Sequence, residues 1–258
     1  MKTDNDSSFE LLHGSALQMR EVASESVALA FTSLPFFSSE IEAVLREPVS
    51  EQTSFDDVGA AVVAFAHGFR PAFTELDRVL MPGGHLVLET KDLRYARRLI
   101  SLSCIHRSMA ESAGLHLVTR LLWQNTAEAP HHGATRRRLG SLEKSGEFRV
   151  VDTEEFLVFL KPGGQEQSGQ HSELETTELG EIVSPLWTLP PTRSWHPHPS
   201  PREVVRRMIL LLSSPGDIVL DPFAGAATIL RTASALGRRA VGYEIDREYW
   251  ARSVSEAL

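Results

Sequence analysis

Short apolar runs alternate along the chain with longer stretches in which apolar residues recur at helical spacing. The short runs predict buried strands, because a strand covered on both faces needs few polar positions, and the longer stretches predict amphipathic helices. The predicted strands are Phe9–His13, Val27–Thr32, His85–Thr90, Leu115–Trp123, Glu155–Leu160, Ile218–Leu220 and Arg239–Tyr243. The predicted helices are Val58–Leu80, Leu93–Ser112, Pro201–Ser213 and Thr228–Leu236. This alternation predicts an α/β fold with a doubly wound, mostly parallel sheet.

Glycine, proline and polar residues separate these elements. The sequence Met81-Pro82-Gly83-Gly84 predicts the end of the first helix. Residues 38–57 and 124–154 are polar and predict turn-like connections. Residues 163–192 are rich in Gly, Gln, Ser, Glu and Thr, and they predict a loop or partly disordered insert.

The stretch from Gly216 to Leu230 predicts a strand, a sharp turn and a helix, and a second strand ends near Glu244. Asp221 closes the first strand, at the edge where open α/β sheets bind ligands, and Gly225 allows the backbone to approach a ligand closely. Glu244 follows Asp221 by 23 residues, a spacing that suits a carboxylate accepting both hydroxyls of a ribose. The stretch lacks the G-x-G-x-x-G motif, so its sequence is not typical of a dinucleotide-binding enzyme. A plain strand–helix–strand unit with a capping Asp and a surface Glu is the alternative.

A second group of candidate residues, Ser33-Leu34-Pro35-Phe36, directly follows the predicted strand Val27–Thr32. The Ser33 hydroxyl and the Leu34 carbonyl can accept hydrogen bonds from an exocyclic amino group, and Phe36 can stack on a planar base. Such acceptors favour a pyramidal amino nitrogen whose exposed lone pair can attack a sulfonium methyl group in line. The alternative is a strand-terminating turn whose aromatic side chains pack into the core.

These two segments and three others resemble, in content and order, the β-class of amino-methylating DNA methyltransferases. The other three are similar to the family patterns E-x-x-R-V-L-K-P-G-G, E-x-x-x-x-F-x-K-P and H-P-x-P-x-P, and they are Glu75–Gly84, Glu155–Pro162 and His196–Arg202. The resemblance runs from about His13 to Tyr249. Five motifs in the order typical of the class are far more specific than any one of them.

The resemblance implies a single domain, residues 1–258, with the Rossmann-like fold of enzymes that use S-adenosyl-L-methionine (AdoMet). A catalytic half, residues 1–162, would precede an acidic insert, residues 163–195, and an AdoMet-binding half, residues 196–258. Ser33 and the Leu34 carbonyl would hold the target amino group, and Pro35 and Phe36 would complete the grip on a base flipped out of DNA. The residues implied for AdoMet are Ser15 at its adenine, Glu244 at its ribose, His196 and Pro197 beside its methionine end, and Asp221, Pro222, Phe223, Gly225 and Thr228 along the methionine.

Ser33 before the Pro-Phe pair resembles the branch that methylates the N4 amino group of cytosine, whereas Asp or Asn at this position is typical of adenine N6 methylation. The resemblance implies double-stranded DNA as substrate and a monomer or weak dimer. It also implies a restriction–modification role, with a cognate endonuclease acting on the same site, although a solitary methylase fits equally well. The alternatives are an adenine-N6 methyltransferase, a catalytically weakened AdoMet- or DNA-binding module, and an RNA or small-molecule methyltransferase.

Three positions depart from the family pattern. Leu34 stands where the family has proline, which leaves the acceptor carbonyl in place but with a less restricted φ. Ala227 replaces a glycine and would be strained by about 1 kcal/mol or more if the position needs a positive φ. Ser15 replaces an Asp that reads the cofactor adenine, and it can accept a hydrogen bond but carries no charge. These departures favour modest AdoMet affinity.

The net charge of −8 is awkward for an enzyme that contacts phosphates. The acidic residues are concentrated, because residues 1–60 hold 11 acidic and 3 basic residues and residues 163–192 hold five Glu and neither Lys nor Arg. The rest of the chain is net positive and can supply a basic surface. Arg136, Arg137 and Arg138 are candidates for phosphate or guanine contacts, or they belong to a solvated loop.

The remaining composition bears on disulfides, metal binding and cellular location. The single cysteine, Cys104, excludes an internal disulfide framework and a cysteine-based zinc site, and we expect it to be buried in a helix. His196 and His198 lack acidic or cysteine partners at ligand spacing, so we expect no metal. The sequence has no stretch of about 18 apolar residues, and its polar N-terminus is unlike a signal peptide. We therefore expect a cytoplasmic protein.

Overall fold

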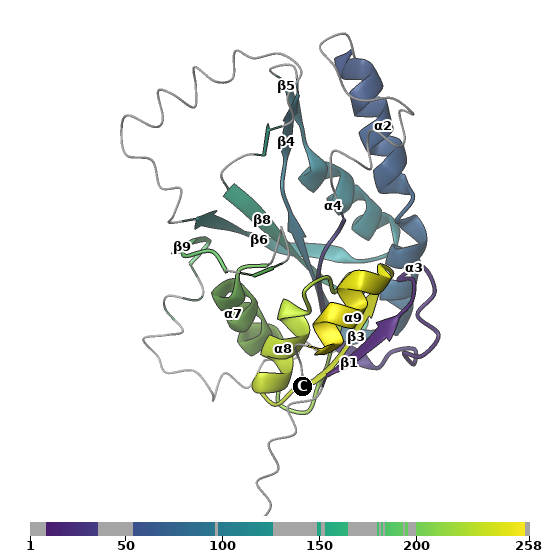
Figure 1. Cartoon of the computed structure of the whole chain (residues 1–258), viewed down its shortest axis with the longest axis vertical. Helices are drawn as coiled ribbons and strands as arrows, with labels where there is room; N and C mark the ends of the chain where they lie inside the picture. The colour runs from purple at the N-terminus through teal and green to yellow at the C-terminus, as the bar shows by residue number, and fades with distance from the viewer. Residues whose placement is uncertain are drawn as a thin grey trace, which may run out of the picture.

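The computed structural model describes residues 9–35, 54–95, 98–125, 149–150, 153–164, 180, 182, 184–192, 194–195 and 200–255. Its centre is an eight-stranded sheet with the strand order β1-β11-β10-β2-β3-β8-β6-β9 (Figure 1). The strands are β1 (Glu10–His13), β2 (Val27–Ser33), β3 (Leu80–Thr90), β6 (His116–Asn125), β8 (Thr153–Leu160), β9 (Leu186–Leu189), β10 (Ile218–Asp221) and β11 (Arg239–Glu244). β8 runs antiparallel to both neighbours, β3 and β6, and the other neighbouring strands of this sheet are parallel. The predicted mostly parallel sheet is confirmed.

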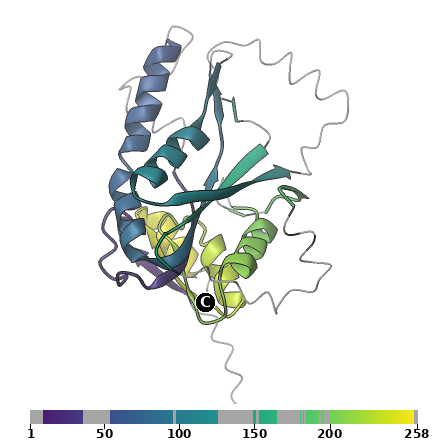
Figure 2. The ribbon, with the colours of Figure 1, turned by 180° about the vertical axis from the view of Figure 1, so that it is seen from behind.

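Helices cover both faces of the sheet, as a doubly wound fold requires. Those on the face toward the viewer in Figure 1 are α7 (Arg202–Leu212), α8 (Thr228–Ala235) and α9 (Arg247–Ser255). Those on the opposite side, seen from behind in Figure 2, are α2 (Phe55–His67), α3 (Arg70–Val79) and α4 (Leu102–Ser112). Within the described residues, no helix is long and apolar enough to cross a membrane.

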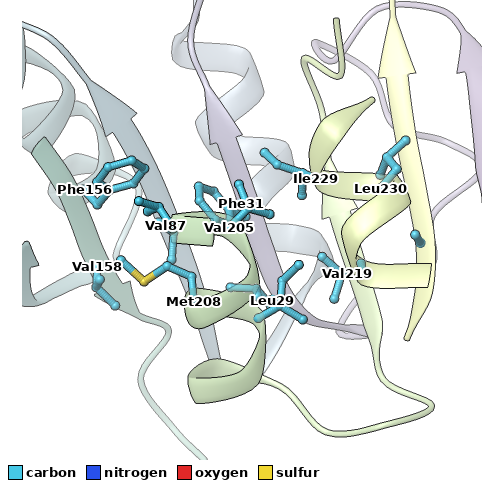
Figure 3. Packing of buried hydrophobic residues seen from close by; sticks show 14 of the residues in the cluster. Leu29, Phe31, Val87, Phe156, Val158, Val205, Met208, Val219, Ile229 and Leu230 are labelled. Carbon is cyan, nitrogen blue, oxygen red and sulfur yellow. The ribbon is translucent and has the colours of Figure 1, made fainter. Parts of the chain in front are cut away.

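Side chains alternate between the two faces along the central strands, so each strand contributes to two separate cores. Leu29 and Phe31 of β2 and Val87 of β3 pack together with residues of α7 and α8 (Figure 3). Ala30, between the first two, packs with α3 and α4 on the opposite face. Phe31 meets Phe156 of β8 edge-on, with ring centroids 6.1 Å apart. The strands read as continuous apolar runs because both of their faces are covered.

The single helix predicted over Val58–Leu80 is wrong, because two helices occupy this stretch. The C-cap of α2 is Gly68, and α3 begins at Arg70 with Pro71 in its first turn. Proline is tolerated there because the first N–H groups of a helix have no intrahelical partner. Pro71 therefore marks a helix start that the apolar periodicity alone conceals.

The helix predicted to stop at Met81–Gly84 does end directly before this stretch, because α3 ends at Val79 with Leu80 as its C-cap. These four residues were not predicted to be part of a strand, however, and they lie inside β3, which begins at Leu80. Gly83 has φ +84°. A Cβ on Gly84 would lie 3.0 Å from the carbonyl oxygen of Val27, and the β2–β3 register shifts between Val27 and Leu29. The two glycines thus form an irregularity within a strand, where bulges and close backbone approach favour glycine.

The first part of the helix predicted over Leu93–Ser112 is wrong as well. A separate three-stranded sheet takes its place, made of β5 (Arg98–Ile100), β4 (Leu93–Tyr95) and β7 (Arg149–Val150). α4 begins only at Leu102. The Asp92 carboxylate accepts hydrogen bonds from the Ser101 hydroxyl and the Ser103 N–H, both at 3.1 Å, and so fixes where the helix starts.

Three smaller expectations are corrected. β9 lies within residues 163–192, which were expected to form a loop; it pairs with β6, and its Trp187 is buried. α9 follows β11 and was not predicted. Cys104 is exposed on α4 rather than buried.

The backbone of Ala227 is left-handed, with φ 55° and ψ 29°, directly before α8. Its side chain is fully buried. An L-residue in this region is strained, because Cβ comes too close to the following carbonyl oxygen. The structure therefore requires a positive φ at position 227, and the strain predicted for Ala227 on that condition applies.

Replacing Ala227 by glycine should raise the free energy of unfolding. Glycine removes left-handed backbone strain of about 1–2 kcal/mol from the folded state. It also increases the conformational entropy of the unfolded chain, which opposes folding, so the net stabilisation should be about 0.5–1 kcal/mol. Urea denaturation followed by tryptophan fluorescence measures the change. The control is Ala233→Gly inside α8, which should destabilise the protein by about 1 kcal/mol. A loss of stability in both variants would contradict strain at Ala227.

Candidate active site

β2 and β10 lie side by side and parallel, with Leu29 opposite Val219 and Ala30 opposite Leu220. From β10 the chain continues through α8 to β11 on one side, and from β2 it continues through α2 and α3 to β3 on the other. α8 and α3 belong to opposite faces. The strand order therefore reverses between β2 and β10, which is the switch point where open α/β sheets bind ligands beyond the carboxyl ends of their strands.

A hydrogen bond joins the two strand ends at the switch point. Thr32 Oγ1 donates to Asp221 Oδ1 at 2.8 Å, and the Phe223 N–H donates to the same oxygen at 3.2 Å. Thr32 and Asp221 are both buried. Ser33, the last residue of β2, and Asp221, the last residue of β10, therefore lie at the same rim of the sheet.

The turn after Asp221 is tied to Glu244 at the end of β11. Gly225 has φ 46°, and its N–H donates to Glu244 Oε2 at 2.8 Å. The Asp246 N–H donates to the other carboxylate oxygen at 2.7 Å. Each oxygen of a carboxylate has two lone pairs, so both can accept a further hydrogen bond from a ligand. Thr228 begins α8 directly after this turn.

Burial raises the pKa of the Asp221 carboxyl from 3.8 to about 7, and the negative charge of Glu244 adds to the rise. The hydrogen bonds from Thr32 and Phe223 lower the pKa but do not offset burial. The Asp221 carboxyl therefore holds its proton more tightly than an exposed aspartate does. A cation at this rim would favour its ionised form.

Ser15 lies at the end of β1, beside β11. The Gly14 N–H donates to the Glu244 carbonyl at 3.0 Å, and the Leu17 N–H donates to Ser15 Oγ at 3.3 Å. A hollow of about 500 Å³ opens here and is lined by Leu12, His13, Gly14, Ser15, Leu17, Gln18, Arg20, Glu21 and Tyr243. This hollow lies at the β1 side of the rim, so Ser15 and Glu244 are near one another while Ser33 is two strands farther along.

Glu75 and Arg78, the charged residues of the segment Glu75–Gly84, hold the loop that follows Ser15. Glu75 Oε2 accepts the Met19 N–H at 2.7 Å, and Arg78 donates to the Met19 carbonyl at 2.8 Å and the Val22 carbonyl at 3.0 Å. The two side chains also pair with one another at 2.9 Å. This segment therefore fixes the path between β1 and β2 through its charged side chains.

Lys161, at the end of the segment Glu155–Pro162, has a comparable structural role. Its Nζ donates to the carbonyls of Asp77 and Leu80 at 2.6 and 2.9 Å. The last carbonyls of a helix have no intrahelical partner, so the lysine satisfies the end of α3. The motif stabilises the connection from α3 to β3.

The sequence interpretation missed a buried acidic pair at this rim, Glu89 of β3 and Glu154 of β8. Glu89 is the register partner of Ser33. Ser200 Oγ donates to Glu89 Oε2 at 2.5 Å, and Lys91 forms an ion pair with Glu154. Burial and the neighbouring Glu154 hold the pKa of Glu89 well above its ordinary range. An acidic residue at the carboxyl end of an apolar run, the feature that identified Asp221, was the available signal for Glu89.

The structure does not describe every predicted residue. Phe36, His196, Pro197 and Arg136–Arg138 lie outside the described residues. Leu34 is buried in the core on the α3 and α4 face. Phe223 meets Phe69 edge-on, with ring centroids 5.5 Å apart. The residues brought to the carboxyl rim are Ser15, Ser33, Asp221, Gly225, Thr228 and Glu244.

The free energy of unfolding should depend on the titration of Asp221. Its pKa is higher in the folded protein than in the unfolded chain, so the folded state holds the proton more tightly. This stabilisation is complete below the unfolded pKa of 3.8 and is lost as pH rises through about 7. Asp221→Asn should therefore lose less stability than the wild type between about pH 5 and 8 in urea denaturation. Asp217→Asn, at the start of β10, should keep the wild-type dependence, and identical curves for Asp221→Asn and the wild type would refute the prediction.

Known proteins are similar to this chain in sequence and in fold. A sequence model of the DNA methylase family matches residues 27–255. The type II methyltransferase M.MjaI of Methanocaldococcus jannaschii is 26% identical over 96% of this chain and 90% of its own length. The DNA adenine methyltransferase YhdJ of Escherichia coli is 27% identical over 93% of this chain and 79% of its own. TTHA0409 of Thermus thermophilus, solved in complex with S-adenosyl-L-methionine, superposes with a TM-score of 0.68 at 25% identity and covers 96% of this chain and 95% of that one. With the family match extending from the first residue of β2 to the last of α9, the chain belongs to the DNA methylase family.

Proposed function

We propose that this chain transfers a methyl group from AdoMet to the exocyclic N4 amino group of cytosine in duplex DNA. The observation that carries the proposal is the meeting of Ser33 and Asp221 at one rim of the sheet, next to the hydrogen bond from Thr32 to Asp221. An in-line transfer needs the amine and the methyl donor side by side, and these two strand ends are neighbours.

The rim fits AdoMet, which supplies a methyl group activated by a positively charged sulfur. Both oxygens of Glu244 keep acceptor capacity beyond their N–H partners and suit the two ribose hydroxyls. Asp221, whose pKa is raised by burial, suits the cationic part of the ligand because a nearby positive charge favours its ionised form. Ser15 is proposed at the adenine. The residues proposed along the methionine are Pro222, Phe223, Gly225 and Thr228, together with His196 and Pro197.

The proposed work of the Ser33 segment is to hold the target amine. The amino lone pair of cytosine is delocalised into the ring, so acceptors aimed at the amino protons make the nitrogen more nucleophilic. The Ser33 hydroxyl and the Leu34 carbonyl would be these acceptors, and Pro35 and Phe36 would hold the plane of the flipped base. The buried side chain of Leu34 anchors this segment in the core on the α3 and α4 face.

Adenine N6 methylation is the second candidate. The relative YhdJ is named a DNA adenine methyltransferase, and it is 27% identical to this chain. Ser33 favours cytosine, because this residue before the Pro-Phe pair resembles the cytosine-N4 branch. Ala227, with its strained backbone, and the uncharged Ser15 also support a weakened AdoMet- or DNA-binding module.

Double-stranded DNA is the proposed substrate, and Arg136, Arg137 and Arg138 are proposed to contact its phosphates or guanines. The relative M.MjaI is named a type II methyltransferase. We therefore also propose a role in restriction–modification, with a cognate endonuclease acting on the same site.

A transfer assay with labelled AdoMet on mixed-sequence duplex DNA tests the reaction, and mass spectrometry of the nucleosides identifies the product. We expect N4-methylcytosine. Ser33→Ala should lower the single-turnover rate by about 100-fold, as loss of one positioned hydrogen-bonding group does. Ser108→Ala, which removes an exposed hydroxyl on α4, should react as the wild type does. N6-methyladenine as the product would contradict the proposal and favour adenine N6 methylation. Absence of transfer would contradict both reactions and favour a weakened AdoMet- or DNA-binding module.

Glu244→Gln should weaken AdoMet binding. The amide nitrogen cannot accept, and it faces an N–H donor from Gly225 or Asp246, so affinity should fall about tenfold or more. Isothermal titration calorimetry measures the dissociation constant. Glu248→Gln, an exposed change on α9, is the matched control and should leave it unaltered. Equal affinity of Glu244→Gln and the wild type would remove Glu244 from the cofactor site.

A further inference from the structure

The acidic pair formed by Glu89 and Glu154 has no part in the transfer as proposed above. Both residues are buried, with 7% and 8% of their surface exposed, and the two carboxyl groups share a hydrogen bond. Buried acids are expensive to maintain unless they are paired or used. Their position at the carboxyl rim places them beside the proposed site of methyl transfer.

The pair lies on the same face of the sheet as Ser33. Ser33, Glu89 and Glu154 stand at the ends of β2, β3 and β8, which are consecutive strands of the sheet. Side chains two residues apart along a strand point to the same face. Each of the three is two residues from a core side chain on the α7 face, namely Phe31, Val87 and Phe156, respectively. The three polar groups therefore share this face at the rim: Ser33 and Glu89 are in register, and Glu154 lies diagonally from Glu89, two residues along β8 from its register partner Phe156.

Ser33 and Glu89 are direct neighbours on this face. They are register partners in parallel strands, whose spacing is about 4.8 Å. A hydroxyl at this position can accept a hydrogen bond from a ligand and donate its own proton toward a neighbouring carboxyl group. The Ser33 hydroxyl can thus connect the proposed amine position with Glu89.

The charged groups that face Glu89 are Glu154 from β8 and Lys91 from the end of β3. The Ser200 hydroxyl, which precedes α7, donates to Glu89 Oε2 at 2.5 Å. Two carboxyl groups in hydrogen-bond contact cannot both be ionised at low cost, so the pair holds one proton. Lys91 pairs with Glu154, and burial raises the pKa of Glu89, which places the proton on Glu89.

Methylation of an amine creates the need for a proton acceptor. The amino nitrogen becomes positively charged as it gains the methyl group, and it must lose a proton to yield the neutral product. The amide-like amine is too weak a base to retain that proton near neutral pH. An acceptor beside the amine would also stabilise the positive charge that develops on nitrogen in the transition state.

We propose that the Glu89–Glu154 pair accepts this proton through the Ser33 hydroxyl, an inference that rests on the proposed amino-methyltransferase function. The nitrogen lone pair forms the bond to the methyl carbon, and the carbon–sulfur bond breaks with its electrons going to sulfur. The amino proton passes to Ser33 Oγ while the Ser33 proton passes to Glu89. The proton already on Glu89 passes to Glu154. The pair then holds two protons, and one leaves to solvent along the partly exposed Lys91 side.

The test is Glu89→Gln, which keeps the shape and the contact to Ser200 but cannot relay a proton. The single-turnover rate should fall about 100-fold or more, the usual contribution of a positioned proton acceptor. The wild-type rate should rise with pH through the ionisation of the pair and then level, and the variant should lack this inflection. The dissociation constant of AdoMet, measured by calorimetry, should stay unchanged.

A second readout does not need transfer. The folded state binds the Glu89 proton more tightly than the unfolded chain, so wild-type stability falls as pH rises through the raised pKa. Glu89→Gln should lose less stability over that range in urea denaturation. For the transfer assay the matched control is Glu155→Gln, because Glu155 follows Glu154 on β8 but points to the other face, and this variant should transfer as the wild type does.

The outcomes separate the two proposals. If the wild type transfers no methyl group, the proposed function fails. If the wild type transfers and Glu89→Gln keeps its rate and pH profile, only the relay is overturned. A slower variant with an unchanged pH profile would also overturn it, by reducing the pair to a structural support. If Glu89→Gln does not fold, Glu154→Gln at the less enclosed end of the pair should show the same loss of rate and inflection.

Discussion

The hydrogen bond from Thr32 to Asp221 joins the two halves of the sheet at the switch point, where the strand order reverses between the parallel strands β2 and β10. Strands β2 and β10 are 189 residues apart in the sequence at this contact, yet they are neighbours in the sheet. Every other feature of the rim is arranged around this pairing. The turn after Asp221 reaches Glu244 through Gly225, and Ser33 reaches Glu89 through the adjoining register. A shift of β2 along β10 would separate all of these groups together, because strand register moves side chains as a set.

The strands were predictable from the sequence because a parallel sheet covered on both faces leaves few polar positions in its strands. Asp221 and Glu244 were predictable because a short turn and helix fix their separation. The glycine and proline residues of Met81–Gly84 correctly marked the end of a helix, but local signals could not show that these residues themselves form a bulge in a strand. The bulge depends on a long-range contact, the close approach of Gly84 to the carbonyl of Val27.

Glu89 was missed for a different reason. Its sequence context, an apolar run followed by an acid, is shared with Asp221, but the partner Glu154 comes from an antiparallel strand more than 60 residues later. Neither propensity nor spacing specifies that pairing. By contrast, Glu75, Arg78 and Lys161 were identified as parts of motifs, and the structure shows what these side chains do: they bind backbone carbonyls and N–H groups of neighbouring segments. A recurrent motif can therefore mark support for a site rather than contact with its ligand.

The rim concentrates acid in a buried place, and that arrangement has an energetic consequence. Asp221, Glu89 and Glu244 are all largely withdrawn from water, and burial raises the pKa of the first two. Holding a proton limits the desolvation penalty, but it leaves acidic groups that a nearby positive charge would ionise at once. A sulfonium donor supplies such a charge before transfer, and the methylated amine carries it afterwards. In the reaction proposed above, the positive charge moves from sulfur to nitrogen, from the Asp221 side of the switch point toward the Ser33 and Glu89 side. Acidic groups on both sides of that path stabilise the charge wherever it lies, so the carboxylates that weaken the fold are the ones that the proposed chemistry uses.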